Sequence, residues 1–424
     1  MIAKMKSSTA RGSAVFLAGL CSLAYFTSYV SRYTFTVCVS ELTSPATGFM
    51  TDGDAGLVCM MLFIFYGGGQ LLSGILGDLV RAEHLVCAGI AGAGACNLIL
   101  PLVIGSPAAV AVLWACHGLL QSMFWPPLMK IVSGRLPERY FSGSMLSVSI
   151  AAHTGNLVLY LVSAFFIGRA GNWRAVFTFA AVLCAVVLAL WIIGFFCFAK
   201  KTPEPEKEVP APVRSGESSV AEKRGGLSYA FLISGFWLLV VGALFQGALK
   251  EGITAWLPNY VRDVYSLSSG SAILWNTAIP AASIACLFLI NLIYAKFLRS
   301  EALGGAAMFG AGALFASVIA FVPSPPPFLT VLCAAMITAS MHGVNLCLIA
   351  YLPGRFSRYG KVSTVSGIMN ACAYIGCSAY IYGITLIASQ AVRALTWFII
   401  PAAGFVFCLV ATPMWKNFCG KDQE

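Results

Sequence analysis

Residues 13–39 read SAVFLAGLCSLAYFTSYVSRYTFTVCV, an apolar stretch with a single charged residue, Arg32. Its length predicts a transmembrane helix, because about 20 mainly apolar residues span the hydrocarbon core of a bilayer. The stretch is too long for a signal peptide and has no small-residue cleavage site. A charged side chain at the centre of a membrane helix costs roughly 2.5–3.5 kcal/mol on insertion scales. We therefore predict that Arg32 has a functional role inside the membrane.

The rest of the chain has the same apolar character. Of its 424 residues, 59% are hydrophobic and 10% are charged, and the mean hydropathy is +0.85, which excludes a soluble globular protein. Each helix satisfies its own backbone hydrogen bonds in lipid, so we predict an all-helical bundle. Twelve segments are expected to span the membrane: 13–39, 54–80, 84–105, 108–134, 140–168, 172–198, 229–257, 269–295, 302–322, 326–352, 363–389 and 393–415.

The basic charge of the chain reflects membrane orientation. The formal net charge is +10, which could suggest a nucleic-acid partner. If both termini are cytoplasmic, however, few basic residues remain outside: Arg169, Arg174, Arg262 and Arg393. Such an excess of cytoplasmic Lys and Arg follows the positive-inside rule. We therefore expect a multi-pass protein of the cell inner (plasma) membrane, with both termini cytoplasmic and no nucleic-acid partner.

The only long polar stretch runs from Ala199 to Gly226 and is rich in Pro, Glu and Ser. It cannot bury a core, so it is predicted to be a flexible cytoplasmic linker. This linker, 199–226, separates two halves of six segments each, 1–198 and 227–424. Lys250 lies in the first segment after the linker, at a depth comparable to that of Arg32 in the first half. Two such cations meeting between the halves would form a site for an anion.

A weak internal repeat supports duplication of a six-helix unit. His117-Gly118 precedes Ser142-Gly143 by 25 residues, and His342-Gly343 precedes Ser366-Gly367 by 24. Two six-helix halves related by a pseudo-twofold axis along the membrane normal are typical of major facilitator transporters, which bind substrate midway between the halves. The loop sequence GILGDLVR, residues 74–81, resembles the Gly-x-x-x-Asp-x-x-Arg motif of that superfamily. Asp78 and Arg81 are therefore expected to act in gating.

Four longer stretches narrow the resemblance. They are YFTSYVSRYTF at 25–35, QSMFWPP at 121–127, AHTGN at 152–156 and LKEGITAWLP at 249–258. In this order they resemble elements of helices one, four, five and seven of the organophosphate:phosphate antiporters, the family of glycerol-3-phosphate and hexose-phosphate transporters. The likeness runs over nearly the whole chain.

The resemblance implies that Arg32 and Lys250 bind the phosphate group, that Tyr25 and Tyr29 line the same cavity, and that His153 lies nearby. Helical spacing independently places Tyr25, Tyr29 and Arg32 on one helix face, at i, i+4 and i+7. Gln246 shares a second such face with Lys250. Gln121 belongs to the helix expected to face Arg32. A guanidinium offers phosphate a planar fork, whereas an ammonium binds as a point charge.

The chain departs from the family pattern at several positions, and an acid frequent in helix eight of the family is missing around Trp275-Asn276. Lys250 stands where many members have arginine, and Gln70 stands where a lysine is frequent. Glu251 places a carboxylate beside Lys250, although adjacent helical residues point about 100° apart, which makes direct pairing awkward. Desolvation and the neighbouring cation have opposite effects on a carboxyl in this position, so Glu251 is a candidate for either charge balance or proton coupling.

Other conspicuous residues receive a structural interpretation. His117 and His342 are expected to be hydrogen-bonded packing residues. The aromatic residues Tyr66, Trp125, Tyr374 and Tyr380 are assigned to packing or interfacial anchoring. The 15 cysteines are scattered singly, without the paired spacing of metal ligands. No catalytic constellation and no Gly-x-x-x-x-Gly-Lys loop occurs in the sequence, so we expect neither an enzyme nor a cofactor.

These features together predict a secondary transporter that works by alternating access. Its substrate is expected to be a small phosphorylated or otherwise anionic metabolite, exchanged for inorganic phosphate. One alternative is proton-coupled symport of an organic anion, with Glu251 or His153 carrying the proton. Another is a transporter-like membrane sensor of phosphorylated metabolites, because the resembling family includes such receptors. We expect a monomer in the lipid bilayer.

Overall fold

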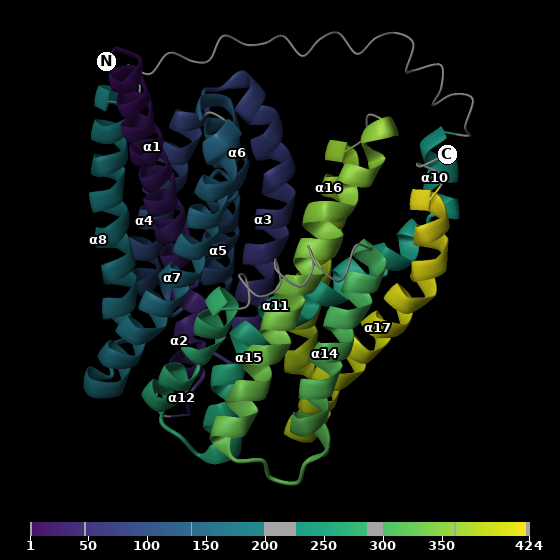
Figure 1. The fold of residues 1–424 in the computed structure, drawn as a ribbon. Coiled ribbons are helices and arrows are strands. Elements are labelled where there is room, and N and C mark those ends of the chain that lie inside the picture. The colour runs from purple at the N-terminus through teal and green to yellow at the C-terminus, as the bar shows by residue number, and fades with distance from the viewer. Residues whose placement is uncertain are drawn as a thin grey trace. The chain divides into compact units, whose positions relative to one another are not determined.

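The computed structural model describes residues 2–45, 48–136, 138–198, 226–285, 300–359 and 362–420. In these ranges the regular structure is helical throughout (Figure 1). The chain forms two compact units: unit 1 within Met1–Val209 and Ser269–Leu274, and unit 2 within Pro210–Ser268 and Trp275–Glu424. The predicted linker lies outside the described residues except for Gly226, so the domain boundaries stay predictions.

Unit 1 contains the helices of the first half and one short helix from later in the chain. In chain order they are α1 (Ile2–Arg32), α2 (Thr34–Leu42), α3 (Asp52–Leu79), α4 (Ala82–Val103), α5 (Pro107–Gln121), α6 (Trp125–Arg135), α7 (Glu138–Ala170), α8 (Trp173–Trp191) and the π-helix η1 (Ile192–Phe198), with α12 (Ser269–Trp275) as the later one. Within unit 1, α1 packs on α7, α3 on α5, and α4 on α8.

Unit 2 contains α10 (Gly226–Ile233), α11 (Phe236–Tyr265), a helix that includes residues 278–285, α14 (Glu301–Phe321), α15 (Pro327–Val344), the π-helix η3 (Asn345–Tyr351), η4 (Leu352–Tyr359), α16 (Val362–Gly383), η5 (Ile384–Leu386) and α17 (Gln390–Gly420). Here α11 packs on α16, and α14 on α17. Each of these pairs is formed by segments far apart in the sequence.

Local sequence explains several helix starts. Thr51 caps α3: its hydroxyl accepts a hydrogen bond from the Asp54 amide, while the Asp54 carboxylate accepts one from the Thr51 amide. Ser106 caps α5 with a single hydrogen bond, which its hydroxyl accepts from the Ala109 amide. Pro107 follows at the first helical position, where its missing amide proton is not needed. Gly235 separates α10 from α11 with a φ of 67°, a conformation that glycine adopts without steric penalty.

Nine spans of the described residues are long and apolar enough to cross a membrane: Ala14–Leu42, Ala82–Val103, Pro107–Val132, Gly143–Arg169, Trp173–Phe195, Phe236–Tyr265, Glu301–Phe321, Pro327–Phe356 and Gln390–Cys419. They correspond to nine of the twelve predicted segments. Of the other three, 54–80 is occupied by α3 and 363–389 by α16, with η5 at its end. The segment 269–295 begins with α12 and continues beyond the described residues.

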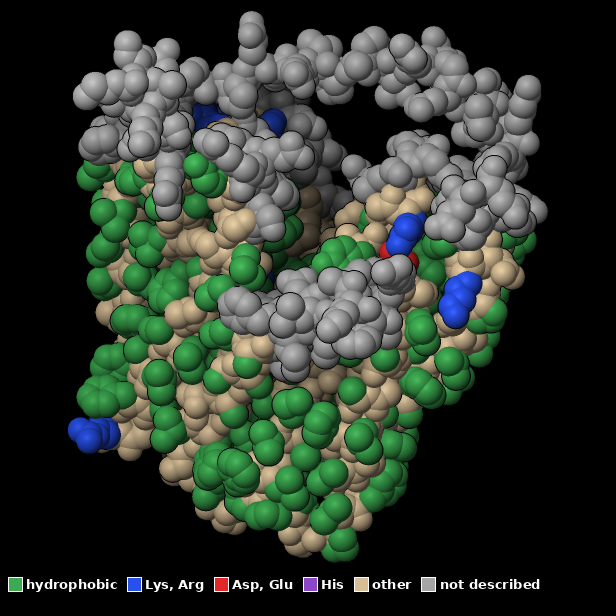
Figure 2. Space-filling view, in the orientation of Figure 1, with side chains coloured by type: hydrophobic (Ala, Val, Ile, Leu, Met, Phe, Trp, Pro, Cys, Tyr) green, Lys and Arg blue, Asp and Glu red, His purple; other side chains and the backbone are tan. Residues whose placement is uncertain are grey.

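The outer surface of these helices is apolar. Hydrophobic side chains cover much of the face shown in Figure 2, and few Lys or Arg side chains appear among those described. Large aliphatic residues such as Leu102, Leu232 and Leu314 are mostly exposed. In water such a surface would be unfavourable, whereas lipid tails solvate it, so this surface suits a membrane protein.

Three predicted segments differ from the observed helices. The first is interrupted after Arg32, because α1 ends there and α2 begins at Thr34. The segment 108–134 is interrupted between Gln121 and Trp125, where Pro126 and Pro127 cannot donate backbone hydrogen bonds and therefore start a new helix, α6. In place of the segment predicted at 229–257, the structure has a helix at Phe236–Tyr265, because Gly235, with its left-handed φ, separates it from the short helix α10.

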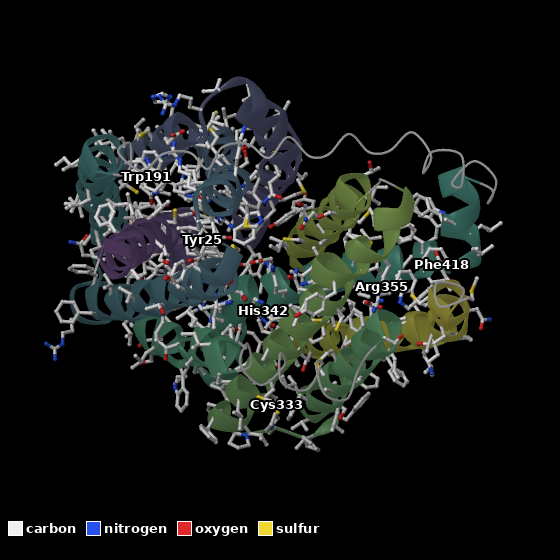
Figure 3. All side chains as sticks on the ribbon, turned by 45° about the horizontal axis from the view of Figure 1, so that its top comes forward. Tyr25, Trp191, Cys333, His342, Arg355 and Phe418 are labelled. Carbon is white, nitrogen blue, oxygen red and sulfur yellow. The ribbon has the colours of Figure 1, made fainter. Side chains whose placement is uncertain are left out.

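Both units contain a buried carboxylate that the sequence did not single out. In unit 1, Glu83 forms ion pairs with Arg81 and Arg135. In unit 2, the Arg355 guanidinium lies 2.7 Å from Glu301, and the Trp415 indole donates to the same carboxylate at 2.8 Å. Figure 3 labels Arg355. In the sequence, both glutamates belong to an Arg-x-Glu pattern, at 81–83 and 299–301, and this repeat could have drawn attention to them.

Candidate substrate site

Arg32 is the last residue of α1 and is only 2% exposed. Its guanidinium carbon lies 4.2 Å from the centre of the Tyr66 ring and 4.9 Å from that of Tyr29, so two aromatic faces stabilise the charge. One guanidinium nitrogen donates to the Ser28 hydroxyl at 3.2 Å. Within the described part of the chain, no carboxylate pairs with Arg32, and its Nε atom has no hydrogen-bond partner. The site therefore holds a buried positive charge with hydrogen-bonding capacity to spare.

Gln121 connects the surroundings of Arg32 to the end of α5. Its Oε1 atom accepts a hydrogen bond from Ser28 at 2.7 Å, and its Nε2 atom donates to Ser31 at 2.8 Å. The same Nε2 atom lies 3.2 Å from Nε2 of His117, whose ring stacks on Trp114 at a centroid distance of 4.4 Å. Gln121 thus fixes the serine that accepts from Arg32, and His117 has a packing and hydrogen-bonding role, as expected.

Aromatic side chains continue along the same face of α1. The rings of Tyr25 and Tyr29 meet edge to face at 5.1 Å, and Tyr25 also contacts Trp125 at 5.2 Å. Figure 3 labels Tyr25 on this helix. The His153 ring, on α7, lies 6.3 Å from Tyr29. The structure therefore brings together three of the predicted substrate residues of unit 1, Tyr25, Tyr29 and His153, and Trp125 packs against Tyr25.

A glycine contact sets the distance between α1 and α7. A Cβ atom at Gly155 would lie 2.6 Å from the carbonyl oxygen of Phe26, closer than such atoms approach. Small residues at this contact allow the two backbones to meet, which brings His153 to the face that carries Tyr29. In the stretch 152–156, His153 thus supplies a polar side chain, and Gly155 allows the two helices to pack closely.

Unit 2 presents its own cation, Lys250, midway along α11. Its Nζ atom lies 3.0 Å from Oε1 of Glu251, and both side chains are largely buried, with 17% and 8% of their surfaces exposed. The expectation that adjacent residues would pair poorly was therefore wrong. The long lysine side chain has enough rotatable bonds to reach a carboxylate that starts about 100° around the helix.

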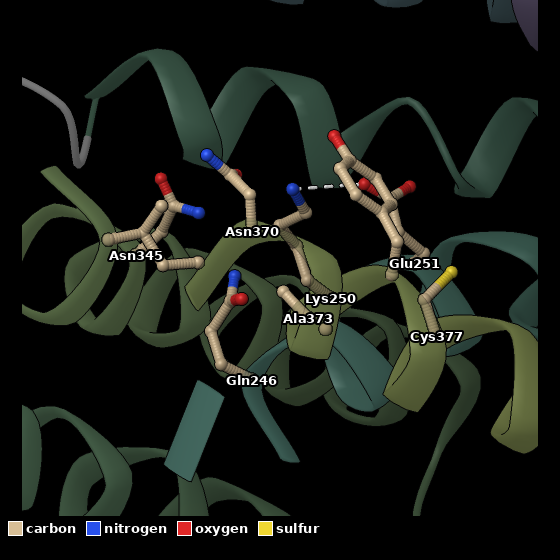
Figure 4. Close-up of a pocket in the computed structure, with 10 residues that line it drawn as sticks. Gln246, Lys250, Glu251, Asn345, Asn370, Ala373 and Cys377 are labelled. Carbon is tan, nitrogen blue, oxygen red and sulfur yellow. Dashed lines mark ion pairs between the residues drawn. The ribbon is translucent and has the colours of Figure 1, made fainter. Parts of the chain in front are cut away.

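Gln246 lies one helical turn before Lys250 and is 1% exposed. Its Nε2 atom donates to the carbonyl oxygen of Met341 at 3.3 Å. Together with Asn345 of η3 and Asn370 and Tyr374 of α16, these α11 residues line a pocket of unit 2, shown in Figure 4. The sequence analysis had found Gln246, Lys250 and Glu251 but not the two asparagines, which lie far away in the chain.

Arg32 and Lys250 occupy equivalent positions within their units. In unit 2, a Cβ atom at Gly376 would lie 2.1 Å from the carbonyl oxygen of Leu244, the counterpart of the contact between Gly155 and Phe26. In each unit the cation follows that carbonyl residue by six positions. The repeat inferred from sequence therefore has a structural counterpart, while the predicted meeting of the two cations at one site stays a prediction.

The gating motif is only partly described. The side chain of Asp78 lies outside the described residues. Arg81 precedes the first turn of α4, is about half exposed, and pairs with Glu83 at 3.2 Å. Arg81 is thus tied to the same carboxylate as Arg135, and its gating role stays a prediction.

Comparison with known proteins identifies the family. The sequence profile of the Major Facilitator Superfamily matches residues 21–381, which include both cations and the loop motif. The chain belongs to the major facilitator superfamily. Members of this superfamily are membrane transporters of small solutes. It resembles the solved structure of a bacterial homologue of the human lysosomal transporter Spinster, with a TM-score of 0.71, 14% identity and coverage of 96% of this chain and 97% of that one. A D-xylose-proton symporter matches with a TM-score of 0.70, 14% identity and coverage of 95% and 97%.

The curated relatives align with this chain over only part of their length. The voltage-gated purine nucleotide uniporter SLC17A9 of Rattus norvegicus is 24% identical over 63% of this chain and 59% of its own. The membrane sensor protein UhpC of Salmonella typhimurium is 24% identical over 61% and 58%. A probable hexose phosphate transport protein of Chlamydia muridarum is 21% identical over 58% and 57%. This major facilitator chain thus aligns with about three fifths of the length of each of these relatives.

Proposed function

We propose that this transporter moves a small phosphorylated metabolite and exchanges it for inorganic phosphate by alternating access. The proposal depends mainly on the environment of Arg32. Its guanidinium is buried, has no carboxylate partner among the described residues and retains an Nε donor without an acceptor there. A buried cation is costly unless an anion compensates it. A phosphate group can supply both the charge and the planar pair of oxygen acceptors that a guanidinium matches.

The position of Arg32 further supports substrate binding. It ends α1 at a helix interruption, and Gln121 ends α5 at another. Interrupted membrane helices expose backbone groups and are common where transporters bind their substrates. We propose that Arg32, Tyr25, Tyr29, His153 and Gln121 bind the substrate from unit 1.

We further propose that Lys250 and Gln246 serve the substrate from unit 2, and that Asp78 and Arg81 act in gating. The protein would reside in the cell inner (plasma) membrane as a monomer, with both termini cytoplasmic, as the distribution of basic residues favours. The names of two relatives, a purine nucleotide uniporter and a probable hexose phosphate transport protein, are consistent with a phosphorylated substrate.

Two other functions have a specific observation in their favour. Glu251 is a buried carboxylate in an ion pair, the kind of group that could carry a coupling proton in a proton-coupled anion symporter. The similarity to the membrane sensor UhpC favours a sensor that signals without transport.

Reconstitution into proteoliposomes tests all three functions. Vesicles loaded with inorganic phosphate should take up labelled glucose 6-phosphate, and empty vesicles should not. Uptake into empty vesicles that depends on an imposed pH gradient would instead indicate proton coupling. Binding without any uptake would support the sensor, and Arg32→Ala should abolish uptake under either transport mechanism.

A further inference from the structure

The first helical segment of unit 1 is interrupted directly after Arg32. α1 ends at Arg32 and α2 begins at Thr34, with Tyr33 between them at a φ of −98° and a ψ of 5°. In a continuous helix the Ser31 carbonyl oxygen would accept from the backbone amide four residues later. An interruption leaves such groups without their helical partners, and lipid cannot replace them. Side chains of neighbouring helices are then needed to supply the missing hydrogen bonds.

Asn97 of α4 binds both sides of this interruption. Its Nδ2 atom donates to the Ser31 carbonyl oxygen at 3.1 Å, and its Oδ1 atom accepts from the Thr34 hydroxyl at 2.6 Å. The Thr34 hydroxyl also lies 3.1 Å from the Ser31 carbonyl oxygen, but it has one proton, and the shorter contact favours Asn97. A second bond from Nδ2, to the Ala93 carbonyl oxygen at 2.9 Å, fixes the orientation of the amide. Because Asn97 is fully buried, water does not compete for these bonds.

Unit 2 shows neither feature in the corresponding helices, both of which are described over their whole length. α11 runs from Phe236 to Tyr265 without interruption, and Lys250 lies midway along it. α14 corresponds to α4, since each has a buried glutamate in its first turn, Glu301 and Glu83. Beyond that turn the one polar residue of α14 is Ser317, whose hydroxyl donates to a carbonyl oxygen of its own helix. The interruption and the asparagine that satisfies it therefore occur together, in unit 1.

We propose that Asn97 is a positioning residue that orients Arg32 by holding the interruption between α1 and α2. Arg32 follows Ser31 and precedes Thr34 by two positions, and these are the two residues that Asn97 binds. Asn97→Leu would remove the donor from the Ser31 carbonyl, which would then regain a partner only from the backbone amide four residues later. The chain would straighten toward a continuous helix and turn the guanidinium away from Ser28, its acceptor at 3.2 Å. This inference rests on the proposed function, in which Arg32 binds the phosphate group.

The test compares two variants of the purified full-length protein. Asn97→Leu preserves the size of the side chain and removes its hydrogen bonds. Ser147→Ala is the matched control, because Ser147 of α7 also bonds to α1, through the Ser22 hydroxyl at 2.5 Å, but far from the interruption. Asn97→Leu should weaken the binding of inorganic phosphate about tenfold, since a misplaced group loses most of its effect, whereas Ser147→Ala should stay within about twofold of the wild-type affinity.

A second measurement requires no ligand. Phenylglyoxal modifies exposed guanidinium groups, and peptide mass spectrometry reports the rate at each arginine. Arg32 is 2% exposed and should react slowly in the wild-type protein, but about fivefold faster or more in Asn97→Leu, because the interruption is no longer held. Arg174, which is exposed in unit 1, serves as the internal reference and should react equally in both proteins.

Thr34 provides a pair of milder variants. Thr34→Val removes one bond of Asn97 and should weaken phosphate binding about threefold, the effect of a single hydrogen bond. Thr34→Ser keeps the hydroxyl and should bind phosphate like the wild-type protein. Because both changes are small, this pair decides the inference even if Asn97→Leu does not fold. An equal loss of affinity in Thr34→Val and Thr34→Ser would overturn the inference.

The outcomes separate this inference from the proposed function. Unchanged phosphate affinity and unchanged modification of Arg32 in folded Asn97→Leu would overturn the inference and leave the phosphate function standing. An equal loss of phosphate affinity in Ser147→Ala would also overturn it, because any loosening of α1 would then suffice. If the wild-type protein binds no phosphate at millimolar concentration, the proposed function fails, and the modification rate of Arg32 alone decides whether Asn97 positions it.

Discussion

Replacing Glu251 by glutamine removes the carboxylate that pairs with Lys250 and preserves the size of the side chain. At the observed 3.0 Å separation, and with an effective dielectric constant of about 20, the attraction between the charges is about 5.5 kcal/mol. Desolvation offsets part of this gain in the intact pair. Breaking a buried pair typically costs about 3–5 kcal/mol, because the remaining charge loses its compensation. We expect the free energy of unfolding of Glu251→Gln to fall by about 3 kcal/mol, since Lys250 retains some exposure.

Phosphate should reverse this loss, because it can replace the missing carboxylate beside Lys250. A ligand at a hundred times its dissociation constant stabilises a protein by about 2.7 kcal/mol. Thermal unfolding of the purified variant, measured with increasing inorganic phosphate, should therefore recover most of the lost stability. Phosphate affinity should rise about tenfold over that of the wild-type protein, and phosphate exchange in proteoliposomes should persist.

Glu301→Gln is the matched control. Glu301 is also buried and paired in unit 2, with Arg355, but it does not line the pocket. Its replacement should destabilise the protein without any additional response to phosphate. If phosphate stabilises Glu251→Gln no more than the wild-type protein, Lys250 is not available to an anion and the reasoning is refuted. If the variant instead loses accumulation driven by a pH gradient while binding is intact, Glu251 carries a coupling proton.

Three further substitutions test the remaining parts of the site. Arg32→Lys should lower uptake about 100-fold without preventing membrane insertion, because a lysine cannot reproduce the guanidinium fork or its stacking on tyrosine. The control Arg174→Lys should leave uptake intact, and wild-type uptake by the Arg32 variant would exclude a binding role for Arg32. His153→Gln should change substrate affinity by less than about tenfold, because the His153 ring packs against Tyr29 with 6.3 Å between the ring centres. A complete loss of binding would show that His153 ranks with Arg32. Gly247→Ala should lower the free energy of unfolding by about 2 kcal/mol or more, because its Cβ atom would lie 1.9 Å from a backbone oxygen. Gly383→Ala is the control, since a Cβ atom at Gly383 would have open space around it. Equal melting temperatures for the two variants would contradict the close helix contact.

The sequence alone determined that the chain is a helical membrane protein of two related halves. Lipid offers no hydrogen bonds, so long apolar runs must be helical, and this constraint depends on composition more than on packing. The same constraint made Arg32 and Lys250 conspicuous, because a charge within such a run needs a reason. Helical periodicity also placed Tyr25 and Tyr29 beside Arg32.

Only the tertiary structure decided which residues these side chains contact. The cation–π contact of Tyr66 with Arg32 joins α3 to α1, and the pairing of Lys250 with Glu251 depends on a rotamer that helical spacing does not specify. Asn345 and Asn370 reach the Gln246 pocket because glycines let α11 and α16 approach. Contacts of this kind depend on the distance between helices that are remote in sequence, and that distance is set by packing across the whole unit.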